Sequence, residues 1–155
     1  MECVIRELSY ADRAIWAEMR AALWPDEPAE NHLRWIDTIL KSGEWGFVAQ
    51  APDSRAVGFA EVSIRKFANA CESAPVPFLE GIWVHEDFRR RGIGARLIAH
   101  VEAFLVRRGF AEIGSDALIA NLGSHAAHKA WGFQERERIV CFCKRLDARP
   151  DGSTV

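Results

Sequence analysis

The chain has 155 residues, a formal net charge of −2 and 49% hydrophobic residues, which is typical of one globular domain. A charge so close to neutral argues against a general nucleic-acid binder, and no apolar run approaches membrane-spanning length. Four scattered cysteines without paired spacing predict neither a disulfide framework nor a zinc site. We therefore expect a reduced, cytoplasmic protein that binds no metal, no nucleic acid and no membrane.

The first half of the chain predicts a strand, two helices and a hairpin. Residues 3–8 alternate as a strand does, and apolar residues at three- and four-residue steps then predict a helix that ends before Pro25. A second helix with one apolar face ends at Gly43. Two strands follow, at residues 45–50 and 57–64, with a turn between them.

The second half predicts three strands and two helices. A central strand at residues 78–84 precedes a long amphipathic helix. A fifth strand (111–116), a short helix (121–131) and a last strand (133–144) complete the pattern. The order β-α-α-β-β-β-α-β-α-β, without repeat or linker, indicates a mixed α/β domain around a central sheet.

A basic, glycine-bearing loop joins the central strand to the long helix, with the sequence Arg89-Arg90-Arg91-Gly92-Ile93-Gly94. Backbone N–H groups at a helix start have no intrahelical partner, and the helix dipole is positive there, so the loop suits a phosphate. Glycines at positions 92 and 94 would let the backbone approach that phosphate closely. The loop matches neither the Walker A nor the Gly-x-Gly-x-x-Gly pattern. The alternative is an ordinary turn with solvated arginines.

The loop, with its spacing Arg-x-x-Gly-x-Gly, resembles the pyrophosphate signature Arg/Gln-x-x-Gly-x-Gly/Ala of the GNAT superfamily of acyl-CoA-dependent N-acetyltransferases. Trp131-Gly132-Phe133 resembles the turn before the last strand of these enzymes, and the predicted order of elements is theirs over nearly the whole chain. The resemblance implies acetyl-CoA as co-substrate, with its pantetheine beside the central strand. The cofactor-binding residues that it implies are Ile82, Trp83, Val84, Arg89, Arg90, Arg91, Gly92, Ile93, Gly94 and Asn121.

Three shorter segments resemble the aminoglycoside 6′-N-acetyltransferases: Trp24-Pro25, Phe78-Leu79-Glu80-Gly81 and Ser115-Asp116. This resemblance implies direct transfer of the acetyl group, in a ternary complex, to the 6′-amine of an aminoglycoside antibiotic, which gives antibiotic resistance. An aminoglycoside carries several ammonium groups, so carboxylates should line its site. The substrate-binding residues implied in this way are Trp24, Glu27, Phe67, Glu80, Asp116 and Glu137.

The resemblance also assigns the proton transfers. Glu80 or Asp116 would deprotonate the amine, directly or through water. The family commonly has a tyrosine four residues before the glycine of the aromatic turn, and it protonates the CoA thiolate; this chain has His128 there, and its only tyrosine is Tyr10. The general acid therefore stays open, with His128 as the candidate.

Structural alternatives accompany each of these roles. Glu80 interrupts an apolar strand and could simply pair with an arginine such as Arg65. Asp116 could serve only a turn, and Trp24 could belong to the core.

Other functions and the assembly state are also left open. The acceptor could instead be a polyamine, an amino-sugar or a protein amine, or the domain could be a non-catalytic acetyl-CoA sensor. Apolar residues on both faces of the last strand suggest a covered edge, and we expect a homodimer. We assign residues 1–146 to a single acetyltransferase domain and residues 147–155 to a flexible C-terminal tail.

Overall fold

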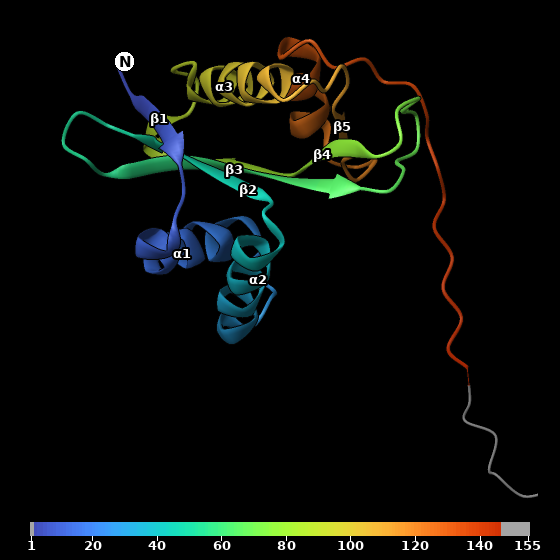
Figure 1. Cartoon of the computed structure of the whole chain (residues 1–155), viewed down its shortest axis with the longest axis horizontal. Coiled ribbons are helices and arrows are strands. Elements are labelled where there is room, and N and C mark those ends of the chain that lie inside the picture. The colour runs from blue at the N-terminus through green and yellow to red at the C-terminus, as the bar shows by residue number, and fades with distance from the viewer. Residues whose placement is uncertain (1, 147–155) are drawn as a thin grey trace, which may run out of the picture.

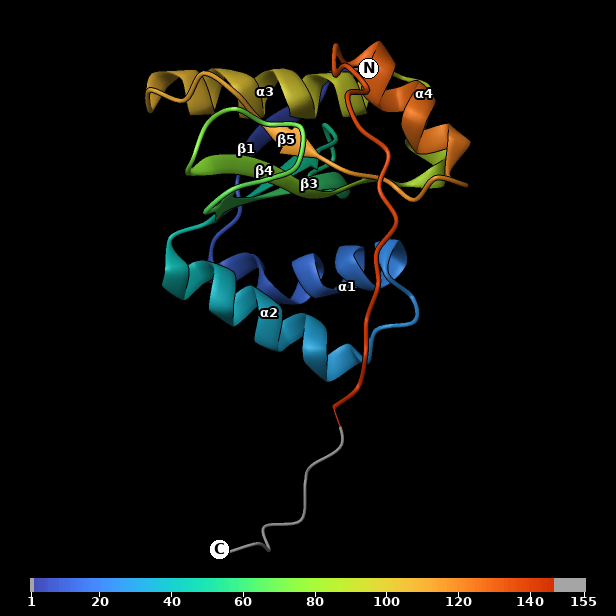
Figure 2. The ribbon, with the colours of Figure 1, turned by 90° about the vertical axis from the view of Figure 1, so that its right-hand side faces the viewer.

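The computed structural model describes residues 2–146, and the predicted tail from Asp147 to Val155 lies outside the described residues. A central sheet separates two helical layers (Figure 1). Figure 2 shows α1 and α2 on one face of the sheet, and α3 and α4 on the other. The elements are β1 (Val4–Glu7), α1 (Arg13–Leu23), α2 (Ala29–Ser42), β2 (Trp45–Gln50), β3 (Ala56–Arg65), β4 (Val76–Val84), α3 (Ile93–Arg107), β5 (Gly114–Ser115) and α4 (Leu122–Ala130).

The sheet has the order β1-β2-β3-β4-β5. The first four strands pair antiparallel, and β5 pairs parallel with β4. Both faces of the middle strands are covered by helices, which explains why β2 and β3 read as nearly continuous apolar runs. The predicted mixed α/β class with a central sheet is confirmed.

Each face of the sheet carries its own core. On the α3 face, Phe47 of β2 packs edge-on against Phe104 of α3, with ring centroids 4.9 Å apart. On the α1 and α2 face, Trp16 and Ile36 are both fully buried with Phe59 of β3. These two cores fix β4 between the helical layers, and β4 carries the predicted site.

The last predicted strand is not formed within the described chain. Residues 134–146 are extended but carry no strand assignment, and the segment leaves the body of the domain (Figure 1). The fifth strand is also shorter than predicted, Gly114–Ser115 instead of residues 111–116. Both differences have one physical cause, because an alternating sequence becomes a strand only where a neighbouring backbone is available for hydrogen bonding.

Candidate functional site

The site is organised by the place where β4 and β5 part. Their parallel ladder contains two residue pairs, Phe78 with Gly114 and Leu79 with Ser115. Strand β4 then continues to Val84, paired with β3. From Glu80 onward the side of β4 that faces β5 has no strand partner among residues 2–146. An extended ligand could add to this edge through backbone hydrogen bonds, and the predicted pantetheine contacts Ile82, Trp83 and Val84 lie along it.

Glu80 lies at a β-bulge that directs it out of the sheet. Glu61 of β3 faces Gly81 and the next residue, Val62, faces Leu79, so Glu80 is the extra residue on β4. Arg65 holds it: Arg65 Nε donates to Glu80 Oε1 at 2.9 Å, and Nη2 donates to Oε2 at 2.7 Å. The pairing with Arg65, raised from the sequence as an alternative, is therefore present.

Asp116 shares the electrostatic environment of this pair. It directly follows β5 and is exposed, and no ion pair holds it within residues 2–146. The pKa of the Arg65 guanidinium is raised, chiefly by its hydrogen bonds to Glu80, and the charge of Asp116 adds to that effect. We call the gap between β4 and β5 beyond Leu79 and Ser115 the opening. Glu80 lies on the β4 side of this opening and Asp116 on the β5 side, and the charges of both act on Arg65.

His128 of α4 is tied to the end of β5. Its Nε2 lies 2.8 Å from Ser115 Oγ, and its Nδ1 lies 2.8 Å from the carbonyl oxygen of Ser124. A carbonyl only accepts, so we assign the Nδ1 proton to that bond, which leaves Nε2 to share a proton with the Ser115 hydroxyl. The same hydroxyl lies 3.3 Å from the carbonyl oxygen of Leu79, and its one proton is donated either to that carbonyl or to Nε2 of His128.

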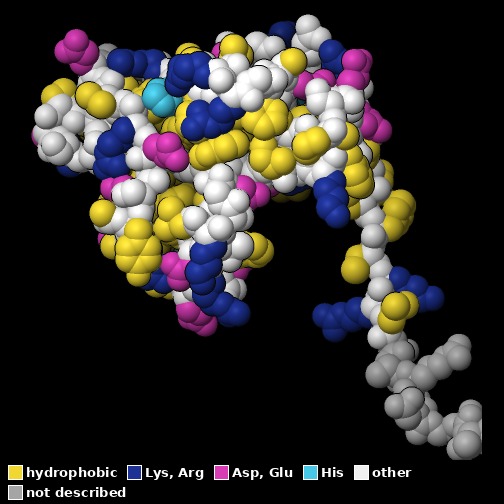
Figure 3. Space-filling model, viewed as in Figure 1, with side chains coloured by type: hydrophobic (Ala, Val, Ile, Leu, Met, Phe, Trp, Pro, Cys, Tyr) yellow, Lys and Arg dark blue, Asp and Glu magenta, His cyan; other side chains and the backbone are white. Residues whose placement is uncertain are grey.

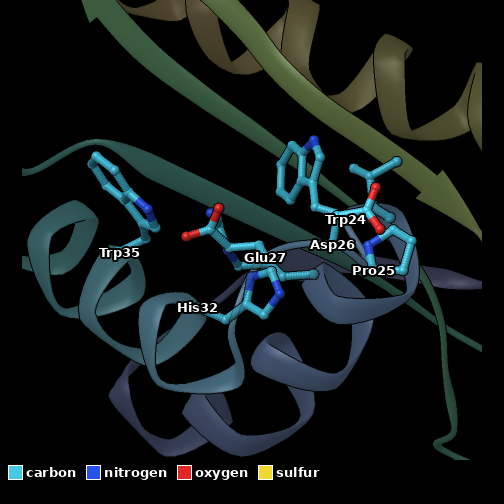
Figure 4. A pocket seen from close by; sticks show the side chains of 8 residues that line it. Trp24, Pro25, Asp26, Glu27, His32 and Trp35 are labelled. Atoms are coloured by element: carbon cyan, nitrogen blue, oxygen red, sulfur yellow. The ribbon is translucent and has the colours of Figure 1, made fainter.

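Trp24 closes the other side of the site. A Cβ at Gly81 would lie 2.6 Å from the Trp24 ring, so only glycine allows the indole to lie against β4 at this point. Beyond Trp24 is a pocket of about 430 Å³ between α1 and α2, whose lining includes Glu27, His32 and Trp35 (Figure 4). The interpretation of Trp24 as a wall of a binding site therefore fits its position, and Glu27 shares that pocket.

The glycine-bearing loop shows two different uses of glycine. Gly92 adopts φ +77° with no atom within 4 Å of its Cβ position, so its open face suits a close ligand. Gly94 is different, because a Cβ there would lie 2.7 Å from the Trp131 ring. The missing side chain of Gly94 thus admits Trp131, and its expected role in the approach of a phosphate stays a prediction. Arg89 fixes the loop to β4 by donating from Nε to the carbonyl oxygen of Val84 at 3.0 Å.

The other predicted site residues, Asn121, Phe67 and Glu137, lie in three different parts of the chain. Asn121 caps α4, accepting a hydrogen bond from the backbone N–H of Ser124 at 3.1 Å, beside the His128 network. Phe67 is 75% exposed in the loop between β3 and β4. Glu137 lies on the extended segment 134–146, outside the cluster around Arg65 in the same chain.

A buried network beneath the site was missed by the sequence reasoning. Glu61 is 3% exposed, accepts a hydrogen bond from Trp16 Nε1 at 2.6 Å and forms an ion pair with Arg20. Burial raises the pKa of Glu61 above its ordinary value, although Arg20 and Trp16 both oppose that shift. Arg20 also lies 4.6 Å from the centroid of the Trp24 ring and so supports the wall of the site from below.

Comparison with known proteins agrees with this geometry. The acetyltransferase (GNAT) family model matches residues 11–133. The aminoglycoside N(6′)-acetyltransferase type 1 of Stenotrophomonas maltophilia is 42% identical over 145 residues, which cover 92% of this chain and 94% of the relative. The enzyme of the same name from Serratia marcescens is 45% identical over 133 residues, covering 84% of this chain and 91% of the relative.

Solved structures show the same similarity. The structure of AAC(6′)-Iy in complex with the bisubstrate analogue CoA-S-monomethyl-acetylneamine superposes with a TM-score of 0.88 at 38% identity, covering 94% of this chain and 100% of that one. AAC(6′)-Ih from Acinetobacter baumannii superposes with a TM-score of 0.86 at 34% identity, with the same coverage. The resemblance drawn from the loop, the aromatic turn and the three short segments is confirmed. The chain belongs to the acetyltransferase (GNAT) family, among the relatives of the aminoglycoside N(6′)-acetyltransferases.

Proposed function

We propose that this protein transfers the acetyl group of acetyl-CoA to the 6′-amine of aminoglycoside antibiotics and so gives resistance to them. The observation that carries the proposal is the unpaired edge of β4, which has the open Gly92 loop at one end and the Glu80 and Asp116 carboxylates at the other. Relatives at about 40% identity over most of the chain carry this activity in their names. The reaction uses a cytoplasmic metabolite, so we place the enzyme in the cytoplasm.

The residues present fit acetyl-CoA. Gly92 is in the left-handed region and open, and the N–H groups of Ile93 and Gly94 begin α3, where no intrahelical acceptor is available to them. Arg89, Arg90 and Arg91 are exposed around this helix start, so positive charge surrounds the place proposed for the pyrophosphate. Acetyl-CoA supplies the thioester, and backbone N–H groups along Ile82 to Val84 would polarise its carbonyl group.

The acceptor amine arrives as an ammonium ion and must lose a proton before it attacks. Glu80 and Asp116 attract the ammonium, and either carboxylate can take the proton, directly or through a water. Arg65 engages both oxygens of Glu80, whereas no ion pair holds Asp116 within residues 2–146, so Asp116 is the less engaged of the two. Because both substrates lie along one opening, the transfer is direct and occurs in a ternary complex.

His128 is the proposed proton donor to the departing thiolate. Its Nε2 points to the Ser115 hydroxyl at the point where β4 and β5 part, and its Nδ1 is fixed by the Ser124 carbonyl. Donation requires a proton on Nε2 as well as on Nδ1. Nε2 then gives its proton to Ser115 Oγ while the hydroxyl gives its own proton to the thiolate, which leaves His128 neutral with the Nδ1 proton on the Ser124 carbonyl. This pair replaces the phenol that the family commonly uses, and the tautomer set by Ser124 orients it.

We also propose that the enzyme is a homodimer that exchanges residues 134–146. This segment exposes Ile139, Val140, Phe142 and Leu146 to between 53% and 93%. Figure 3 shows hydrophobic side chains on an arm apart from the body. The sheet ends at the two-residue strand β5, an open edge. Addition of the arm to the β5 edge of a second copy would complete a strand there, and it would bring Glu137 to that copy.

Light scattering tests the dimer at micromolar concentration. The full chain should have twice the mass of the monomer, and a chain ending at Phe133 should be monomeric. A monomeric full chain, or a truncated chain that still dimerises, would contradict the proposed exchange.

Steady-state thiol release tests the site itself. We expect Asp116→Asn and Glu80→Gln each to lower kcat/KM for kanamycin by about a hundredfold, because a general base contributes about 10²–10⁴-fold. The matched control is Glu102→Gln, which neutralises an exposed carboxylate on α3 away from the opening. Unchanged kinetics in both site variants would remove the carboxylates from the mechanism.

A further inference from the structure

His32 is a buried polar residue whose side chain has no hydrogen-bond partner among residues 2–146. Its side chain is 1% exposed, and neither Nδ1 nor Nε2 has a hydrogen-bond partner in the described structure. Buried polar groups are nearly always hydrogen-bonded, because leaving them unpaired forfeits their hydration without compensation. A phenylalanine or leucine would fill the same volume without that cost. The imidazole therefore points to a hydrogen-bond partner beyond residues 2–146, and the pocket that it lines can admit a ligand.

The pocket that His32 lines has a distinctive chemistry (Figure 4). Trp24 and Trp35 provide two indole walls, and Asp26 and Glu27 provide two carboxylates. Glu27 is held in place by Asn31, whose Nδ2 donates to Oε1 at 2.6 Å. The positive charge of Arg20, at the back of the pocket, is already paired with Glu61. Indole faces and carboxylates attract a cation, and an imidazole with one donor and one acceptor matches a hydroxyl group or an amine.

The pocket and the transfer site share Trp24. The indole lies against Gly81, the neighbour of Glu80, and the same ring lines the pocket. A ligand whose reactive amine lies at Glu80 and Asp116 can therefore extend past Trp24 without leaving the protein surface. An aminocyclitol or amino-sugar ring at the far end of an amine substrate is such a cation, and it also carries hydroxyl groups.

We infer that this pocket binds a second ring of the substrate, beyond the ring that bears the acceptor amine, and that His32 is the hydrogen-bonding residue that selects it. The inference rests on the proposed function, because it assigns the remote part of the same substrate. His32 and Trp35 are then specificity-determining residues, and neither touches the reacting atoms. Their contacts should affect KM for substrates that have a second ring and should not affect kcat.

The test compares a substrate that has the second ring with one that lacks it. The variant His32→Phe keeps the ring volume and removes both nitrogens, and Trp35→Leu removes an indole wall that is 53% exposed. The substrates are neamine, which has a second ring, and methyl 6-amino-6-deoxyglucoside, which has only the acceptor ring. We expect each variant to raise KM for neamine about tenfold or more with kcat retained, since unpaired polar groups in a site discriminate at least this strongly. The KM for the single-ring amine should stay within about twofold.

Calorimetric binding of neamine and thermal unfolding complete the test. Retained melting temperatures would show that both variants fold, and Trp35→Leu keeps the test decisive if His32→Phe does not fold. The inference is overturned if folded variants bind neamine as the wild type does, or if KM rises equally for both substrates. Failure of the proposed function has a different signature, because the wild type itself would then acetylate neither compound.

Discussion

Replacing Arg20 should lower the free energy of unfolding, because the buried carboxylate of Glu61 would lose its cation. The side chains of this ion pair are 9% and 4% exposed, and burial raises the pKa of Glu61 even with Arg20 present. The variant Arg20→Met keeps an unbranched side chain in the core but leaves Glu61 charged and without its cation. Breaking a buried pair from one side costs about 3–5 kcal/mol, a large part of the total stability of a small domain.

The pH dependence of this loss has a definite sign. Without Arg20, the folded-state pKa of Glu61 rises further above its ordinary value of 4.5, because the cation that opposed desolvation is gone. An acid with a raised folded-state pKa penalises folding at pH values above its unfolded pKa, and the penalty disappears as the pH falls toward that value. The difference between wild type and Arg20→Met should therefore be largest near pH 8 and smaller near pH 5.

Urea unfolding followed by tryptophan fluorescence measures both effects. The double variant Arg20→Met with Glu61→Gln is the control, because glutamine is neutral and keeps an oxygen for Trp16 Nε1. It should recover at least about 2 kcal/mol of the loss, since the uncompensated charge is removed. A loss below about 1 kcal/mol in the single variant, or a loss that is independent of pH, would refute this account of the buried pair.

Two further stability predictions come from other parts of the fold. Arg6 lowers the pKa of Asp12 to about 2, so Asp12→Asn should destabilise the protein by about 1–2 kcal/mol at neutral pH. The loss should shrink to about half a kcal/mol or less near pH 2, where about half of the wild-type carboxyl is protonated. Equal losses at both pH values in acid and urea titrations would oppose this. Gly94→Ala should lower stability by about 1–3 kcal/mol and weaken acetyl-CoA binding, because its Cβ meets Trp131 at 2.7 Å. Gly123→Ala is the matched control, because its nearest contact is 3.8 Å. Thermal melts and calorimetry check the pair, and similar values for the two variants would disprove the steric argument.

The sequence predicts the middle of the fold well because its signals there are local. The apolar face of α3 and the apolar run of β4 identify the helix and the strand without knowledge of distant residues. The last strand fails for the opposite reason. The alternation from Phe133 onward shows that the segment could form a strand. Whether it does depends on a partner strand elsewhere, which the segment's own residues do not reveal.

The sequence proposes site residues, which stay predictions, and it indicates few of the contacts between them. The pairing of Glu80 with Arg65 was foreseen as an alternative, because a carboxylate in an apolar strand needs a partner. The same signal marks Glu61 in β3 and was overlooked there. The contact of Gly94 with Trp131 could not be predicted, since the spacing of a motif does not reveal which residue far along the chain packs against its glycine.

The most direct test of the proposed activity compares two aminoglycosides that differ at one atom. Kanamycin carries an amine at the 6′ position, and its analogue carries a hydroxyl group there. The account predicts that the protein releases CoA thiol from acetyl-CoA with the 6′-amine compound, that the product is acetylated at that nitrogen, and that the 6′-hydroxyl compound gives no release. Release with both compounds, or with neither although acetyl-CoA binds, would contradict it.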